Sequence, residues 1–373
     1  MQQGDPLGPL YFCCGFQSII DRIASLGPVY QKWYMDDGGI VGPTDLLLKV
    51  WDILKNEGPP LGLHLNPTKC EWSWLNADCD LPCPLEHVQL VPTSEIQMLG
   101  VPLGSDGFVS DYVEGKLLAN SVKVMSKLTE FEDSQAAMYL LRLSYGIVRA
   151  NHFMRTTPLP QWRDVAAKFD DCVRDAVCKI LGTPLPDSSY DQACISTKVG
   201  GLGIRRVVDH AIGALRASWH ESSRTCGESW TAPAPLAEGD EYVPQSEFSA
   251  DVDRKTLERL IDEGKERDAQ RLRRLDMPHA NVWTSARPSV QDGKDCVLSP
   301  RVYLTCVRRL LGLPVISTPV PCPLCKQTMD VYGDHALCCK KSGDMITRHN
   351  RVRNLVYHFA DVGLLDPEWR SWV

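Results

Sequence analysis

The stretch KWYMDDGGIVG at residues 32–42 limits the fold more than any other part of the sequence. Two short apolar runs flank the adjacent acids Asp36 and Asp37, and two glycines follow the acids directly. Such runs around a turn predict two short strands joined tightly into a hairpin. Acidic residues at a hairpin tip are usually solvated. On a rigid, buried sheet, however, paired carboxylates are suitable ligands for Mg²⁺.

The length of 373 residues and the hydrophobic content of 43% are those of a globular protein with two or three domains. No apolar run reaches about 18 residues, and the N-terminus lacks a charged and apolar leader, so neither a membrane span nor a signal peptide is predicted. We therefore expect an intracellular protein, in the nucleus, the cytoplasm or both. In that reducing environment the 15 cysteines are interpreted as thiols or metal ligands. Cys13 and Cys14, in an apolar run, are predicted to be core thiols.

Charge is distributed unevenly along the chain. The net charge of −7 is unfavourable for a nucleic-acid-binding protein, and residues 1–150 hold 10 Lys and Arg against 18 Asp and Glu. Residues 301–373 reverse this balance, with 10 bases against 6 acids. The C-terminal segment is therefore the part that we expect to contact nucleic acid through charge.

Helical patterns dominate from residue 111 onward, and one helix is predicted earlier. Residues 44–58 predict a helix that has Thr44 as its N-cap and Gly58 as its stop. Residues 161–181 repeat apolar side chains at helical spacing. Residues 221–248 have the composition of a linker, and residues 251–276 predict a charged, solvated helix with at most one docked face.

Three further blocks occur in a fixed order around the acidic pair. QQGDPLGPL (2–10) precedes it, and GLHLNPTKCEW (62–72) and IQMLGVPLG (96–104) follow it. In this order the chain resembles the reverse transcriptases of non-LTR retrotransposons, from their motif B to motif E. STKVGGLGIRRVVDHAIGALRASW (196–219) also resembles the segment that follows the polymerase in many of them. The resemblance implies an RNA-directed DNA polymerase that transfers nucleotides with two Mg²⁺ ions.

The fold implied by this resemblance is a partial α/β (α+β) polymerase palm, followed by a mostly α-helical thumb and connector and a small zinc-binding module. The palm would occupy residues 1–110, the thumb and connector 111–220, a linker and charged helix 221–298, and a basic zinc-knuckle-like module 299–373.

The resemblance also assigns roles to individual residues. Asp36 would be a ligand of the catalytic Mg²⁺ ions, with Asp37 as its less critical neighbour. Lys69 would protonate the pyrophosphate leaving group, although an exposed lysine after a proline turn is the simpler interpretation. The RNA template, the DNA primer and the deoxynucleotides, which are the implied partners, would lie against Gln3, Gly4, Asp5, Pro6, Tyr34 and Met35.

Two-metal chemistry needs a carboxylate from a second strand. In the family that this chain resembles, that strand lies well upstream of the Gln-Gly-Asp-Pro sequence, which is residues 3–6 here. Only Met1 and Gln2 precede that block here. We therefore expect a catalytically incomplete chain, from a truncated element or an incomplete gene model. The alternatives are a non-catalytic zinc-knuckle protein that binds nucleic acid and a product without function.

The segment CPLCKQTMDVYGDHALCC at residues 322–339 is the densest cysteine cluster. Cys322, Cys325 and His335 with a final cysteine have the C-x2-C-x9-H-x3-C spacing of a structural zinc site when that cysteine is Cys339. Buried thiols are the alternative. The segment resembles the CPLC…GDHAL-x-C…RHN stretch found after the polymerase in the same elements, which selects Cys339 over Cys338. His349 is a competing ligand.

Basic residues surround this cluster, and they predict contacts with phosphates. A solvated basic helix is the alternative. The residues are Lys340, Lys341, Arg348, Arg351 and Arg353. A second motif, GGLG at 200–203, lacks the strand and spacing of a phosphate loop and predicts a turn between packed segments.

Overall fold

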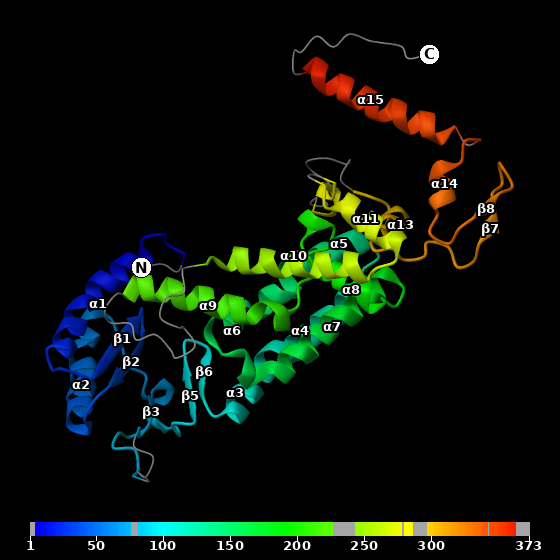
Figure 1. The fold of residues 1–373 in the computed structure, drawn as a ribbon. Coiled ribbons are helices and arrows are strands. Elements are labelled where there is room, and N and C mark those ends of the chain that lie inside the picture. The colour runs from blue at the N-terminus through cyan, green and yellow to red at the C-terminus, as the bar shows by residue number, and fades with distance from the viewer. Residues whose placement is uncertain are drawn as a thin grey trace. The chain divides into compact units, whose positions relative to one another are not determined.

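The computed structural model describes residues 4–75, 81–226, 243–277, 280–285, 297–341 and 343–362 (Figure 1). Contacts within the chain divide it into two compact units. The first contains Met1–Gly115 and Pro160–Trp162, and the second contains Lys116–Leu159 and Arg163–Val373. The finer division expected at residues 110, 220 and 298, and the polymerase palm itself, stay predictions.

The first unit combines helices with pairs of short strands. Its elements are α1 (Gly8–Ala24), β1 (Tyr30–Tyr34), β2 (Asp37–Val41), α2 (Thr44–Glu57), β3 (Glu71–Trp72), β4 (Gln89–Leu90), β5 (Glu95–Met98), β6 (Val101–Gly104) and α3 (Asp106–Val113). Antiparallel pairing of β1 with β2 confirms the hairpin predicted around the acidic pair. A second antiparallel hairpin is formed by β5 and β6, and β3 pairs with β4 in parallel.

The core of this unit is a small apolar cluster on α1 and α2. It contains Phe16, Ile19, Ile23 and Val50, and Trp33 of β1 packs edge-on against Phe16 with ring centroids 5.1 Å apart. The Trp33 ring lies across Gly38 on the paired strand, where a Cβ atom would come within 2.2 Å of it. The first glycine after the acidic pair is therefore required for this packing.

Two local expectations for the first unit are wrong. Pro43, in an extended conformation, holds the N-cap position of α2, so Thr44 is already helical and caps nothing. Cys13 and Cys14 are exposed thiols, because α1 turns Phe16, Ile19 and Ile23 toward the core and leaves the two cysteines off that face.

The second unit is mostly helical. Its elements are α4 (Ala119–Thr129), α5 (Ser134–Leu140), α6 (Asn151–Thr156), α7 (Arg163–Leu181), α8 (Asp187–Cys194), α9 (Val207–Cys226), α10 (Gln245–Glu263), α11 (Glu266–Leu275), α12 (Val282–Ser285), α13 (Pro300–Leu310), β7 (Val320–Pro321), β8 (Thr328–Met329), α14 (Asp334–Cys338) and α15 (Asp344–Val362). Among the described residues, no helix combines the length and the apolar character needed to cross a membrane.

Helix α7 matches the apolar repeat predicted at 161–181, and it also fixes the start of α9. The Asp170 carboxylate accepts hydrogen bonds from the backbone N–H groups of Val207 (2.8 Å) and Val208 (3.1 Å). Burial raises the pKa of Asp170 to about 7, while these two donors act in the opposite direction. One helix therefore caps the N-terminus of another.

The charged segment at 251–276 forms two helices instead of one. Gly264, in an extended conformation, ends α10, and α11 begins two residues later. Leu257 and Leu260 of α10 and Leu272 of α11 are buried together with Ile195, so both helices have a docked face. The linker predicted at 221–248 is shorter than expected, because α9 continues to Cys226 and α10 begins at Gln245. Residues 227–242 lie outside the described residues.

Gln192 on α8 joins three parts of the second unit through a buried polar contact. Its side chain is 1% exposed, and its Nε2 donates to the carbonyl oxygens of Gly200 and Leu310, each at 2.9 Å. Its Oε1 accepts a hydrogen bond of 2.8 Å from the Arg271 guanidinium. This one amide therefore fixes α11 and the end of α13 against α8.

Replacing Gln192 with leucine tests this arrangement. The variant keeps most of the volume but removes the donor of the Gly200 carbonyl and one acceptor of Arg271, which keeps its contacts with Leu310 and Asp268. The free energy of unfolding should therefore fall by about 1–3 kcal/mol. Chemical unfolding followed by circular dichroism measures the change. Gln270→Leu is the matched control, since Gln270 is exposed and bonds only to Glu266 within α11. Equal stability of the two variants would contradict the role given to Gln192.

Candidate metal centre and acidic hairpin

The acidic pair lies at the tip of the β1–β2 hairpin. Met35 and Asp36 form the two-residue turn, Asp37 begins β2 opposite Tyr34, and both aspartates are exposed. Met35 has a φ of 55°, a conformation that glycine usually supplies at this position of a tight hairpin. The tip is therefore held in a strained geometry, at a cost on the order of 1 kcal/mol.

The other described residues assigned to this site lie on the β1–β2 hairpin, before α1 and after α2. Tyr34 is exposed at the end of β1, and Lys69 is exposed at the end of the single 3-10 turn Pro67–Lys69. Gly4, Asp5 and Pro6 precede α1, and the Asp5 carboxylate accepts a hydrogen bond of 2.9 Å from the Leu7 N–H. Gln3 lies outside the described residues.

The acidic hairpin does not form a complete metal site in the part of the chain that the structure describes. Within that part, no group of three or more His, Cys, Asp or Glu ligand atoms includes Asp36 or Asp37. Two exposed carboxylates alone do not satisfy the ligand requirement of two-metal catalysis. The expected Mg²⁺ site therefore has no structural support beyond the pair itself.

Cys322, Cys325, His335 and Cys339 converge in the second unit, with all four ligand atoms within 4.8 Å of one another. The Sγ atoms of Cys322 and Cys339 are 3.8 Å apart, and Sγ of Cys325 is 3.1 Å from Nε2 of His335. Two Zn–S bonds of about 2.3 Å at a tetrahedral angle would place their sulfurs about 3.8 Å apart. This group could hold a metal ion such as zinc.

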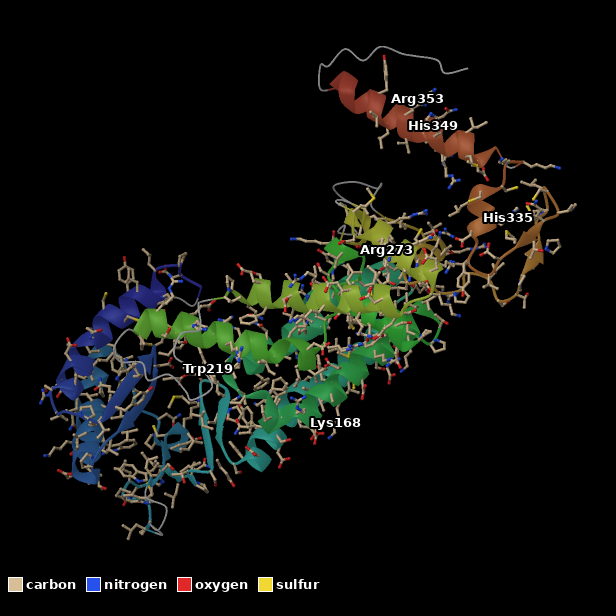
Figure 2. The ribbon with its side chains drawn as sticks, viewed as in Figure 1. Lys168, Trp219, Arg273, His335, His349 and Arg353 are labelled. Atoms are coloured by element: carbon tan, nitrogen blue, oxygen red, sulfur yellow. The ribbon has the colours of Figure 1, made fainter. Side chains whose placement is uncertain are left out.

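A tight turn between β7 and β8 presents the first two sulfurs. The Cys322 N–H donates to the Gln327 carbonyl (2.8 Å), and the Lys326 N–H donates to the Cys322 carbonyl (3.0 Å). Lys326 takes a φ of 66° to complete this turn. Helix α14 then carries His335, which is labelled in Figure 2, and ends beside Cys339. A hairpin and one helical turn therefore supply the ligands.

The electrostatics of this turn favour a metal-binding thiolate. The backbone N–H groups of Cys325 and Leu324, together with His335, lower the pKa of Cys322 to about 6. Burial raises the pKa of Cys325, which acts in the opposite direction. Thiolate is the form that binds zinc, so the turn is partly prepared for the ion.

The two competing ligands lie outside the cluster. Cys338 is exposed although it is adjacent to Cys339, which is buried. His349 is exposed on α15 (Figure 2) and does not belong to the ligand group. The geometry thus brings Cys339 to the other three ligands, as the family resemblance implied.

Asp330 is a residue of this centre that sequence reasoning missed. Its Oδ1 accepts hydrogen bonds from the N–H groups of Tyr332 (2.8 Å) and Asp334 (3.2 Å), and its Oδ2 accepts one from His335 (2.9 Å). Although burial opposes ionisation, these backbone donors lower the pKa of Asp330. The sequence signal that could have indicated its role is the spacing of Asp330 and Gly333, because an aspartate three residues before a glycine is common in turns.

The basic residues near the cluster are mostly accessible. Lys340, Lys341 and Arg351 are exposed. Arg348 donates a hydrogen bond to the Leu337 carbonyl and so ties α15 to α14, while the half-buried Arg353 donates to Asn354.

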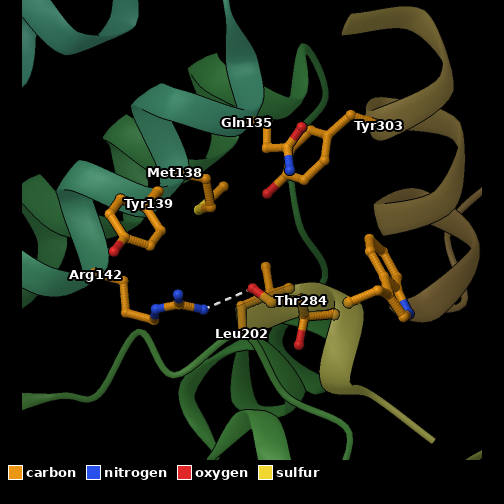
Figure 3. A pocket seen from close by; sticks show the side chains of 8 residues that line it. Gln135, Met138, Tyr139, Arg142, Leu202, Thr284 and Tyr303 are labelled. Atoms are coloured by element: carbon orange, nitrogen blue, oxygen red, sulfur yellow. Dashed lines mark hydrogen bonds between the residues drawn. The ribbon is translucent and has the colours of Figure 1, made fainter. Parts of the chain in front are cut away.

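Two other features carry no site. In the GGLG turn, the N–H groups of Leu202 and Gly203 donate hydrogen bonds to the carbonyl oxygens of Ala193 and Ile195. These N–H groups are therefore not available to bind a phosphate. A cavity of about 10 Å³ (Figure 3) has room for about one water molecule. Its lining residues are Gln135, Met138, Tyr139, Arg142, Leu202, Trp283, Thr284 and Tyr303.

Comparison with known proteins gives one distant relationship. No protein-family model and no solved structure matches the chain. The chain is 23% identical over 212 residues to the Retrotransposable element SLACS 132 kDa protein of Trypanosoma brucei gambiense. That match covers 57% of this chain and only 17% of the relative. The similarity therefore relates the chain to a retrotransposon protein.

Metal content tests the four-ligand centre. The full chain, purified with zinc and then dialysed, should retain one Zn²⁺, as measured by elemental mass spectrometry. Cys325→Ser should lose most of this metal because one of four ligands is removed. Cys338→Ser and His349→Ala are matched controls and should keep it. Metal-free wild-type protein, or retention in Cys325→Ser, would show that these residues are ordinary thiols and an imidazole.

Proposed function

We propose that this chain is part of a retrotransposon reverse transcriptase, and that its zinc-held C-terminal module binds nucleic acid. The convergence of Cys322, Cys325, His335 and Cys339 within 4.8 Å carries the proposal. The similarity to a retrotransposon protein supports the wider assignment, as does the ordered set of motifs around Asp36. The polymerase assignment rests on those motifs.

Zinc would have a structural role in this module. Three thiolates and a neutral imidazole would fill the four positions of the ion and leave none for a substrate. The filled site would carry one net negative charge, which would offset only part of the positive charge of the basic residues around it. Lys340, Lys341 and Arg351, which are exposed, are free to face phosphates.

Binding to a labelled single-stranded RNA, followed by fluorescence anisotropy, tests the nucleic-acid part. The triple variant of Lys340, Lys341 and Arg351 to alanine should bind at least about tenfold more weakly at low salt. The slope of log affinity against log salt should also become shallower, by about 0.7 for each lost phosphate contact. Lys265→Ala, which removes an exposed lysine at the start of α11, should change neither quantity. Unchanged binding by the triple variant would refute this role.

Nucleotidyl transfer is the part of the proposal that the described residues support least. Asp36 and Asp37 are presented together at a hairpin tip, which suits the family's Mg²⁺ ligands, but no third ligand joins them within the described ranges. This observation favours a second candidate function, in which the chain binds nucleic acid without catalysis.

Primer extension separates the two candidates. With Mg²⁺, deoxynucleotides and an RNA template, the 373-residue chain should extend a DNA primer no more than Asp36→Asn does, because an incomplete ligand set cannot stabilise the transferring phosphoryl group. A reverse transcriptase of known activity is the positive control. Extension by wild type that Asp36→Asn abolishes would mean that another acid completes the site, and the catalytic candidate would then stand.

A further inference from the structure

The segment 330–334, which we call the docking loop, lies against the helices α11 and α13. The Arg267 guanidinium carbon on α11 is 3.7 Å from the centre of the Tyr332 ring. From α13, Arg309 donates a hydrogen bond of 2.9 Å to the Tyr332 carbonyl. Two arginines from separate helices therefore hold one tyrosine of the loop, one by its ring and the other by its backbone.

Asp334 strengthens this contact at the start of α14. Its Oδ2 is 3.2 Å from Nε of Arg267, and its Oδ1 is 2.9 Å from Nη2 of Arg309. The three side chains are 36–45% exposed, so each pair alone would contribute little. The two ion pairs share Asp334, and the stacked Arg267–Tyr332 contact joins them, so the set forms one network rather than isolated pairs.

The backbone of the docking loop also fits its support closely. The N–H groups of Val315 and Ile316 both donate to the Val331 carbonyl, at 2.8 and 3.1 Å. Gly333 has a φ of 75°, and a Cβ atom there would come within 3.1 Å of the Val315 side chain. The loop is therefore fitted to this surface by its shape as well as by charge.

Asp330 connects the docked side of the loop to the metal ligands. The carboxylate that shapes the loop, by accepting from Tyr332 and Asp334, also accepts from the N–H of His335. His335 itself follows Asp334 directly and places its Nε2 3.1 Å from Sγ of Cys325. One carboxylate therefore contacts both the docking loop and the backbone of a metal ligand.

We propose that metal binding at the four-ligand cluster is coupled to docking of residues 330–334 on α11 and α13, with Arg267 and Arg309 as positioning residues for His335. This inference rests on the proposed zinc site. Metal binding orders the loop that the arginines hold, and the arginines in turn hold the loop in its metal-binding form. Coupling of this kind is reciprocal: each event strengthens the other by the same factor.

Zinc affinity of the full chain, measured by competition with a chelator of known affinity, gives the first test. The double variant Arg267→Ala/Arg309→Ala should bind zinc at least about fivefold more weakly, the lower end of typical coupling between sites. Arg273→Ala/Arg301→Ala is the matched control, since it removes exposed arginines from the same two helices (Arg273 is labelled in Figure 2). The control should bind zinc like the wild type.

Hydrogen exchange gives the reciprocal test. Zinc should slow amide exchange in α11 and α13 of the wild type relative to chelator-treated protein, and this protection should be lost in Arg267→Ala/Arg309→Ala. Tyr332→Phe, which keeps the ring under Arg267, should retain coupling, whereas Tyr332→Ala should lose it. A merely destabilised helix would exchange faster with or without zinc, and would not depend on the Tyr332 ring.

The outcomes separate this inference from the proposed function. If the wild type does not bind zinc, the zinc site fails and the coupling fails with it. If the wild type binds zinc, but the Arg267→Ala/Arg309→Ala variant binds equally tightly and zinc leaves exchange in α11 and α13 unchanged, the coupling is overturned and the zinc site stands. Weaker zinc binding together with zinc-dependent protection of the two helices supports the coupling.

Discussion

The convergence of four metal-ligand atoms in a segment without an apolar core is the constraint on which the C-terminal module depends. From residue 320 to 341, the buried side chains among the described residues are those of Cys322 and Cys339. Burial of apolar area therefore offers this segment little free energy with which to oppose its conformational entropy. A metal ion would supply that free energy locally, since structural zinc sites contribute on the order of 10 kcal/mol in small peptides.

The helical part of the second unit provides a rigid support for this module. Gln192 fixes α11 and the end of α13 through buried hydrogen bonds, and the same two helices carry Arg267 and Arg309. A buried amide with all its partners satisfied is specific about direction, unlike an apolar contact. The buried hydrogen bonds of Gln192 thus help to position the helices that carry Arg267 and Arg309. These two arginines contact the docking loop, which leads to His335.

Local patterns in the sequence predicted local structure well. The hairpin at residues 32–42, α7 and the Cys322–Cys339 cluster all follow from short-range spacing and turn residues. Two local predictions failed for different reasons. Gly264 divides a charged segment into two helices. The packed face of α1 faces the core with other residues and leaves Cys13 exposed.

Long-range contacts could not be predicted from spacing. Arg267 and Tyr332 are far apart in the sequence, and no periodicity relates them, so their stacking becomes visible only in the structure. The same limit applies to the acidic hairpin. Adjacent aspartates can be read from the sequence, but the ligands that would complete a catalytic site come from elsewhere in a fold.

The left-handed backbone of Met35 has a consequence for how this hairpin can change. Glycine at this position would relieve strain on the order of 1 kcal/mol, but its greater freedom in the unfolded chain would offset part of that gain. It would also widen the range of backbone angles beside Asp36. Methionine at this tip therefore keeps some backbone strain and, with it, a narrower range of backbone angles beside Asp36.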